Sequence, residues 1–143
     1  MNPPAIQGLC PLMQVFDMPT SLAFYRDLLG FQIVQQAPPG DRCDWAWLAR
    51  DGAELMLNTM HEADARPTTQ DCARMMAHGD TALFIGAPDV EAMYEYLRAR
   101  GVVVDPPVVR PYGMKQLSLK DPDGYGICFQ WRAAEPLRAA NGG

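Results

Sequence analysis

Apolar and polar residues follow a helical period in some segments of this chain and a strand period in others. The clearest helical segment is 18–29, whose apolar side chains form one stripe: Leu22, Tyr25, Leu28 and Leu29. Asp17 stands where an N-cap is needed, and Gly30 suits the left-handed conformation in which helices commonly end. The pattern therefore predicts an amphipathic helix that Gly30 closes and that passes directly into a strand.

The same order of elements is predicted twice along the chain. In the first half we expect a helix and four strands, at 18–29 and at 9–16, 31–36, 44–49 and 53–60. In the second half we expect a helix and four strands, at 88–100 and at 80–86, 102–104, 114–120 and 125–132. Tight turns join the last two strands of each half, at Arg50-Asp51-Gly52 and at Asp121-Pro122-Asp123-Gly124.

Glycines mark a repeat between the two halves. Gly30 and Gly101, which end the two helices, lie 71 residues apart, and the hairpin glycines Gly52 and Gly124 lie 72 apart. Two landmarks with nearly the same offset indicate an internal duplication. We therefore expect a single domain, 1–143, made of two repeats, a polar linker and a flexible tail: 9–60, 80–132, 61–79 and 133–143, respectively.

Composition restricts the possible functions. The chain has 143 residues, enough for one domain with its own core, and 48% of them are hydrophobic. A net charge of −5 gives no electrostatic footprint for nucleic acid or an anionic membrane. There is no apolar run of membrane-spanning length and no signal-peptide pattern, so we expect a cytoplasmic protein. The four cysteines form no CxxC pair and are expected to be free thiols.

With the repeat in view, the sequence resembles the vicinal oxygen chelate superfamily of glyoxalases, bleomycin-resistance proteins and extradiol dioxygenases, and within it the bleomycin-resistance branch most closely. The similar segments are Val15-Phe16-Asp17, Ser21-Leu22-Ala23-Phe24-Tyr25-Arg26-Asp27-Leu28-Leu29-Gly30-Phe31, Pro111-Tyr112-Gly113-Met114 and Asp121-Pro122-Asp123-Gly124-Tyr125. The resemblance implies an α+β fold of two βαβββ modules, with a curved sheet around a cavity and helices on the outer face. It also implies a homodimer.

Strand alternation predicts which side chains face that cavity. A uniformly apolar set should lie under the helices: Ala53, Leu55, Leu57, Leu117, Leu119, Ile127, Phe129 and Trp131. The mixed set on the opposite faces is Leu12, Gln14, Glu54, Met56, Asn58, Met114, Gln116, Ser118, Cys128 and Gln130, with Tyr112 at a mouth. The alternative is that these polar residues face water on an open sheet. Aligned by the repeat, Trp45 and Trp47 are expected on the helix side, in the core.

The resemblance also implies four places for metal ligands, one on the first and last strand of each module. These places fall on Cys10, on Glu54 or Met56, on Asp80 or Thr81, and on Cys128. None of them is a histidine, since both histidines, His61 and His78, lie in the linker. A Cys/Cys/Glu/Asp zinc site is conceivable, but nothing in the spacing demands it. We therefore expect no cofactor, with a divalent metal as the alternative.

These features favour metal-independent binding of a small amphipathic or aromatic molecule in the cavity of a dimer. We expect Gln14, Glu54, Met56, Asn58, Tyr112, Met114, Gln116, Cys128 and Gln130 to bind that ligand, and the sequence identifies no catalytic residue. The alternative activity is a metal-dependent glyoxalase-like lyase or isomerase, or an extradiol-type dioxygenase. A third possibility is an accessory domain that binds a protein partner.

Overall fold

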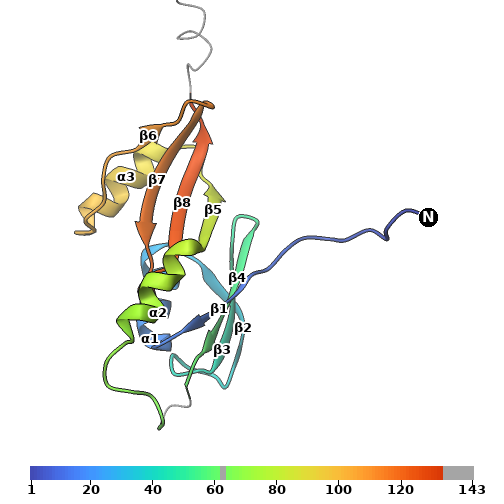
Figure 1. The fold of residues 1–143 in the computed structure, drawn as a ribbon, viewed down its shortest axis with the longest axis vertical. Coiled ribbons are helices and arrows are strands. Elements are labelled where there is room, and N and C mark those ends of the chain that lie inside the picture. Colours follow the sequence, from blue (N-terminus) through green and yellow to red (C-terminus); the bar gives the residue numbers. More distant parts are fainter. Residues whose placement is uncertain (62–63, 134–143) are drawn as a thin grey trace, which may run out of the picture. The chain divides into compact units, whose positions relative to one another are not determined.

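The computed structural model describes residues 1–61 and 64–133, so the predicted tail lies outside the described residues from position 134 onward. The chain divides into two compact units, Met1–Asp71 and Cys72–Gly143. Each unit holds one four-stranded sheet and its own helices, as the ribbon shows (Figure 1). No helix of the described chain combines the length and hydropathy that crossing a membrane requires.

The first unit is a βαβββ module. Its elements are β1 (Leu12–Val15), α1 (Met18–Leu22), the π-helical η1 (Ala23–Leu28), β2 (Gln32–Ala37), β3 (Trp45–Arg50) and β4 (Ala53–Thr59). The strand order is β1-β4-β3-β2, with β1 parallel to β4 and the other pairs antiparallel. The crossover from β1 through the helix thus returns the chain to the far edge of the sheet, where β2 begins.

The helix of the first unit forms where the sequence predicts it. The Asp17 side chain accepts a hydrogen bond from the backbone N–H of Thr20 at 3.2 Å, which caps α1. Gly30 ends the helical run with φ at +79°, a conformation that glycine adopts without strain. The helical side chains pack onto one sheet face in a fully or almost fully buried core: Met13, Val15, Leu22, Tyr25, Leu29, Leu48, Leu55 and Leu57.

The second unit repeats the module after a short helical lead-in. Its elements are α2 (Cys72–Ala77), the 3₁₀ turn η2 (His78–Asp80), β5 (Ala82–Gly86), α3 (Val90–Ala99), β6 (Val108–Val109), β7 (Met114–Lys120) and β8 (Gly126–Arg132). The strand order is β5-β8-β7-β6, with β5 parallel to β8. Within this unit α3 lies along β7 and β8 (Figure 1). Helix α2 lies inside the segment 61–79 that the sequence predicts as a linker.

The predicted repeat is visible in the backbone itself. Asp89 caps α3 by accepting from the N–H of Ala92 at 2.9 Å, as Asp17 does for α1. Gly101 shares the φ of +79° found at Gly30, and the hairpin glycines that follow Asp51 and Asp123 have φ of +87° and +88°. The predicted fold class is therefore confirmed: the chain is α+β and consists of two βαβββ modules. Within residues 1–61 and 64–133 each four-stranded sheet is open and does not close on itself.

One predicted strand is wrong. The valine run 102–104 forms no strand, and the third strand of this module is the short β6 at Val108–Val109. The N–H of Val102 instead bonds to the carbonyl of Leu97 at 3.0 Å, so the run begins by completing the end of α3. Pro106 and Pro107 follow, and since proline has no N–H to donate, a sheet ladder cannot begin until they are passed.

Candidate functional site

In the first unit, the sheet face opposite the core gathers the residues predicted there. Met56 pairs with Leu12 of β1, and Asn58 pairs with Gln14. Glu54 lies two positions before Met56 on β4, so its side chain shares this face. Leu12 and Glu54 are exposed, whereas Met56 and Asn58 are half-buried. We call this face the first wall.

The placement of two tryptophans in the core is wrong. Trp45 pairs with Asn58 and Trp47 with Met56, so both indoles lie on the first wall. The core positions of β3 are instead Ala46 and Leu48, which are fully buried. Both alternating sets of β3 are apolar, so its hydrophobic pattern does not fix its face. Aligning β3 by the repeat shifts it by one residue from its true register, and a one-residue shift moves every β3 side chain to the opposite face of the sheet.

Glu54 is held by one of these tryptophans. The Trp47 indole N–H donates to Glu54 Oε1 at 3.1 Å. Burial, and after it the nearby Glu54 carboxylate, raises the pKa of the Cys10 thiol. The Cys10 thiol is therefore less readily ionised, and so less nucleophilic, than an ordinary exposed cysteine. Glu54 itself accepts a hydrogen bond on a wall whose other named side chains are aromatic, aliphatic, thioether and amide.

In the second unit, strand pairing again places the predicted residues on one sheet face. Across β7 and β8, Gln116 pairs with Gln130, and Met114 and Cys128 occupy the same face two positions away. Phe84 of β5 pairs with Cys128 and is 58% exposed. Cys128 itself is buried. We call this face the second wall.

A hydrogen-bonded cluster is centred on Gln116, which is only 7% exposed. Its Oε1 accepts from Arg110 Nε at 3.0 Å, and its Nε2 donates to the Tyr112 hydroxyl and to Gln130 Oε1, both at 3.0 Å. Two predicted site residues, Tyr112 and Gln130, thus both bond to a third, Gln116. Arg110 is not among the residues that the sequence predicts for this site. Its signal is its position, because Arg110 opens the Pro111-Tyr112-Gly113 turn that places Tyr112.

The nine predicted ligand residues therefore fall into two groups, one in each unit. The first wall carries Gln14, Glu54, Met56 and Asn58, and the second wall carries or adjoins Tyr112, Met114, Gln116, Cys128 and Gln130. Ligand binding by either group stays a prediction, as does the expectation that both groups line one cavity.

Potential metal-binding side chains do not cluster among the described residues. Nowhere in 1–61 and 64–133 do three or more His, Cys, Asp or Glu side chains gather as a metal site requires. His78 Nδ1 lies 2.7 Å from the backbone oxygen of Asp123, and its ring stacks on Tyr125 with centroids 3.9 Å apart. His61 makes an edge contact with Phe16 at 6.3 Å. In these contacts both histidines serve the packing of their units.

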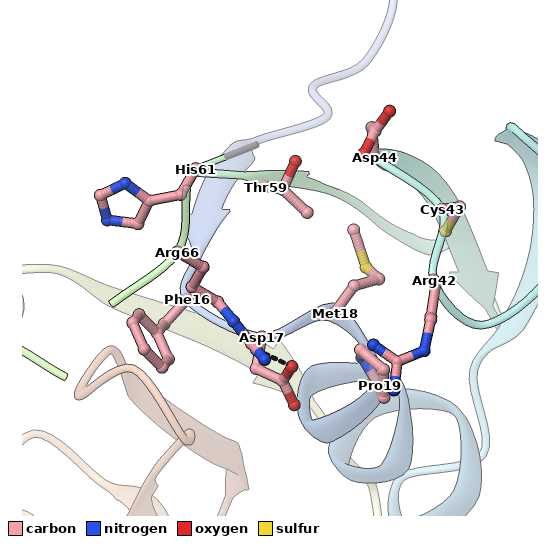
Figure 2. A pocket seen from close by; sticks show the side chains of 10 residues that line it. All are labelled: Phe16, Asp17, Met18, Pro19, Arg42, Cys43, Asp44, Thr59, His61 and Arg66. Atoms are coloured by element: carbon pink, nitrogen blue, oxygen red, sulfur yellow. Dashed lines mark hydrogen bonds and ion pairs between the residues drawn. The ribbon is translucent and has the colours of Figure 1, made fainter. Parts of the chain in front are cut away.

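A small pocket lies elsewhere in the first unit, and none of the predicted residues lines it (Figure 2). Its volume is about 50 Å³, well below the roughly 300–1,000 Å³ of drug-sized ligand sites. On the pocket wall Arg66 forms an ion pair with Asp17, and its guanidinium also lies 5.2 Å from the centroid of the Phe16 ring. Burial acts to raise the pKa of Asp17, but hydrogen bonds from Thr20 and Arg66 outweigh it and lower that pKa. These contacts connect the N-terminus of α1 to the segment that follows β4, so the pocket is a structural contact within the first unit.

Comparison with known proteins gives a consistent family. The model of the Glyoxalase/Bleomycin resistance protein/Dioxygenase superfamily matches residues 9–129. No curated protein matches the chain. Among solved structures, TnmS3, an antibiotic-binding protein from Streptomyces sp. CB03234, is 25% identical with a TM-score of 0.61, covering 90% of this chain and 99% of that one.

Two further structures share the fold at lower identity. TioX from Micromonospora sp. ML1 is 20% identical with a TM-score of 0.65, covering 87% of this chain and 99% of that one. Lactoylglutathione lyase from Agrobacterium tumefaciens is 21% identical with a TM-score of 0.64, covering 90% and 94%, respectively. The similar folds therefore include a binding protein and an enzyme, and the fold alone does not choose between them.

Proposed function

Because this chain belongs to the Glyoxalase/Bleomycin resistance protein/Dioxygenase superfamily, we propose that it binds a small amphipathic or aromatic molecule without a metal, as a homodimer in the cytoplasm. The observation that carries the proposal is the composition of the two walls. Both are sheet faces opposite a packed core, yet they hold large apolar side chains beside a few fixed polar groups. That mixture is typical of sites for organic ligands.

The first wall supports the aromatic part of this proposal. Trp45 and Trp47 are half-buried, and Leu12, which lies across Met56 from Trp47 on the same face, is 54% exposed. Indole rings provide large, stiff surfaces on which a planar molecule can stack. The Trp47–Glu54 hydrogen bond fixes one indole in orientation, so little conformational freedom is lost when a ligand binds there.

The donor chemistry supports binding without a metal. Burial raises the pKa of the Cys10 thiol, and the two histidines are engaged in packing contacts. TnmS3, which resembles this chain along most of both sequences, is described as an antibiotic-binding protein. A role in capturing a planar natural product is the function that these residues support best.

Tryptophan fluorescence tests the proposal directly, because Trp45 and Trp47 lie on the first wall. Planar aromatic compounds from a test panel should quench or shift the tryptophan emission, and this effect should saturate as the compound is added. Treating the protein with a chelator beforehand should leave the binding curve unchanged. Met56→Asp places a charge between ligand and indole and should weaken binding at least about tenfold, since burying an unpaired charge is costly.

Met76→Asp is the matched control, because Met76 is 79% exposed on α2 and lies on neither wall. It should bind as the unaltered chain does, and thermal unfolding of both variants checks that they fold. Sedimentation equilibrium tests the dimer in the same samples. Failure of every aromatic compound to bind at millimolar concentration would overturn the proposed function, and binding that appears only after a metal is added would overturn its metal independence.

A further inference from the structure

We propose that the second wall selects ligands that present a hydrogen-bond acceptor, above all an anionic oxygen such as a carboxylate or phenolate. This inference rests on the proposed function and adds the polarity of the ligand's head group. It follows from the direction in which the hydrogen bonds of the Gln116 cluster run.

Arg110 sets that direction. A guanidinium only donates hydrogen bonds, so the Gln116 atom at 3.0 Å from Arg110 Nε must be the amide oxygen. The amide nitrogen of Gln116 then faces the other two partners and donates both of its hydrogens. Tyr112 must therefore accept through its hydroxyl oxygen, and Gln130 through its own amide oxygen. The two amides cannot be turned around without placing donor against donor.

The consequence is that acceptors are used inside the cluster and donors are left at its surface. The Tyr112 hydroxyl proton, the Gln130 amide N–H₂ and both terminal nitrogens of Arg110 have no hydrogen-bond partner among the described residues. Tyr112 is 69% exposed, Arg110 is exposed, and Gln130 is half-buried. These groups remain available to a ligand that arrives with oxygen acceptors.

The charged side chains on the second wall are also positive. The strand positions of β7 and β8 on the second wall include Lys120 and Arg132 and no carboxylate. Within the described residues neither Arg110 nor Arg132 forms an ion pair. This wall is cationic in a chain whose net charge is −5, so an anionic group gains an attraction there that the molecule as a whole does not offer.

The donors are also held in place before a ligand binds. Residues 110–113 form a tight turn in which the Gly113 N–H donates to the Arg110 carbonyl at 2.9 Å, and the Arg110 N–H donates to the Met114 carbonyl at 2.8 Å. Pro111 occupies the second position of this turn, where its fixed φ is favoured. Gly113 completes it with φ at +86°. A preorganised donor array loses little entropy on binding.

Three naphthalene probes of equal size separate the alternatives: 2-naphthoate, 2-naphthalenemethanol and 2-naphthylmethylammonium. We expect 2-naphthoate to bind the full chain at least about tenfold more tightly than the ammonium probe, measured by saturation-transfer NMR titration at pH 7.5. Arg110→Met should reduce this preference to about twofold or less while the affinity for the alcohol changes less than about twofold. Tyr112→Phe leaves the charge unchanged but removes the exposed hydroxyl donor, together with the acceptor of one Gln116 N–H, and should lower the preference part of the way.

Arg98→Met is the matched control, because Arg98 is an exposed arginine on α3 and its loss changes the net charge equally. It should leave the preference for 2-naphthoate intact. If all three probes bind with equal affinity, or if Arg98→Met acts as strongly as Arg110→Met, the donor array does not select the ligand and this inference is overturned while the proposed function stands. If none of the probes binds, the proposed function falls and this inference with it.

Discussion

Replacing Gly124 by alanine tests how firmly the second hairpin turn is held against α2. Gly124 has a φ of +88°, a conformation that costs other residues about 1–2 kcal/mol. A β-carbon at this position would collide with the carbonyl oxygen of Met75 and lie 3.0 Å from its carbonyl carbon. Because these are backbone atoms, no side-chain rotation can relieve the clash. Either α2 or the turn must move.

The internal repeat provides a matched control at Gly52. Its φ is +87°, and no atom lies within 4 Å of an added β-carbon. Gly52→Ala should therefore cost only the conformational term, about 1–2 kcal/mol. Gly124→Ala should add about 1–3 kcal/mol of overpacking, for a total of about 2–5 kcal/mol. The total expected for Gly124→Ala is a large share of the free energy of unfolding of a typical domain, roughly 5–15 kcal/mol.

Urea unfolding, followed by tryptophan fluorescence and far-UV circular dichroism, measures both costs. Trp45 and Trp47 report on the unit that contains Gly52, and Trp131 reports on the unit that contains Gly124. We expect Gly124→Ala to lower the free energy of unfolding by at least about 1 kcal/mol more than Gly52→Ala does. Equal losses, within about 0.5 kcal/mol, would contradict the prediction and show that α2 does not press on the turn.

Two charge substitutions give further predictions. Asp17→Asn keeps an N-cap but removes the charge that binds Arg66, so the free energy of unfolding at pH 7 should fall by about 0.5–1 kcal/mol. Because folding lowers the pKa of Asp17, the full difference in free energy of unfolding should be present above the unfolded pKa of about 3.9. It should vanish as pH falls through the folded pKa. Urea titrations that give equal losses at neutral and acid pH would contradict this prediction. Glu54→Gln should lower the raised pKa of Cys10 and speed its alkylation at pH 8 by about two- to threefold, because burial, the larger cause, remains. Peptide mass spectrometry in a Cys72→Ser background measures this rate, and an unchanged rate would show that the Glu54 carboxylate does not act on the thiol.

Much of the fold could be predicted because its signals are local. The aspartates that cap α1 and α3 act on the helix turn beside them, and Gly30 and Gly101 supply a φ that other residues avoid. These choices need only neighbours within a few residues of the chain. Because the two halves repeat, the helix predicted in one half supports the helix predicted at the matching place in the other. The strand predicted at 102–104 failed where two local signals competed, because a β-branched valine run lies between a helix end and two prolines.

The candidate site was predictable only where alternation was unambiguous. On β4, β7 and β8 one face is polar or mixed and the other is apolar, so Met56, Gln116 and Gln130 were assigned to the correct face. On β3 both faces are apolar, and Trp45 and Trp47 were assigned to the wrong one. Nothing within β3 distinguishes the two faces; its pairing with β4 does.

The duplication, the hairpin turns and the ends of the main helices can be predicted from the sequence alone, since each depends on short-range backbone preferences. The register of β3 instead depends on its pairing with β4, which places Trp45 and Trp47 on the first wall. The tertiary structure also decided the joining of Arg110, Tyr112 and Gln130 through Gln116. Those contacts form between the β6–β7 turn and two paired strands, so they exist only after the sheet has brought these segments together.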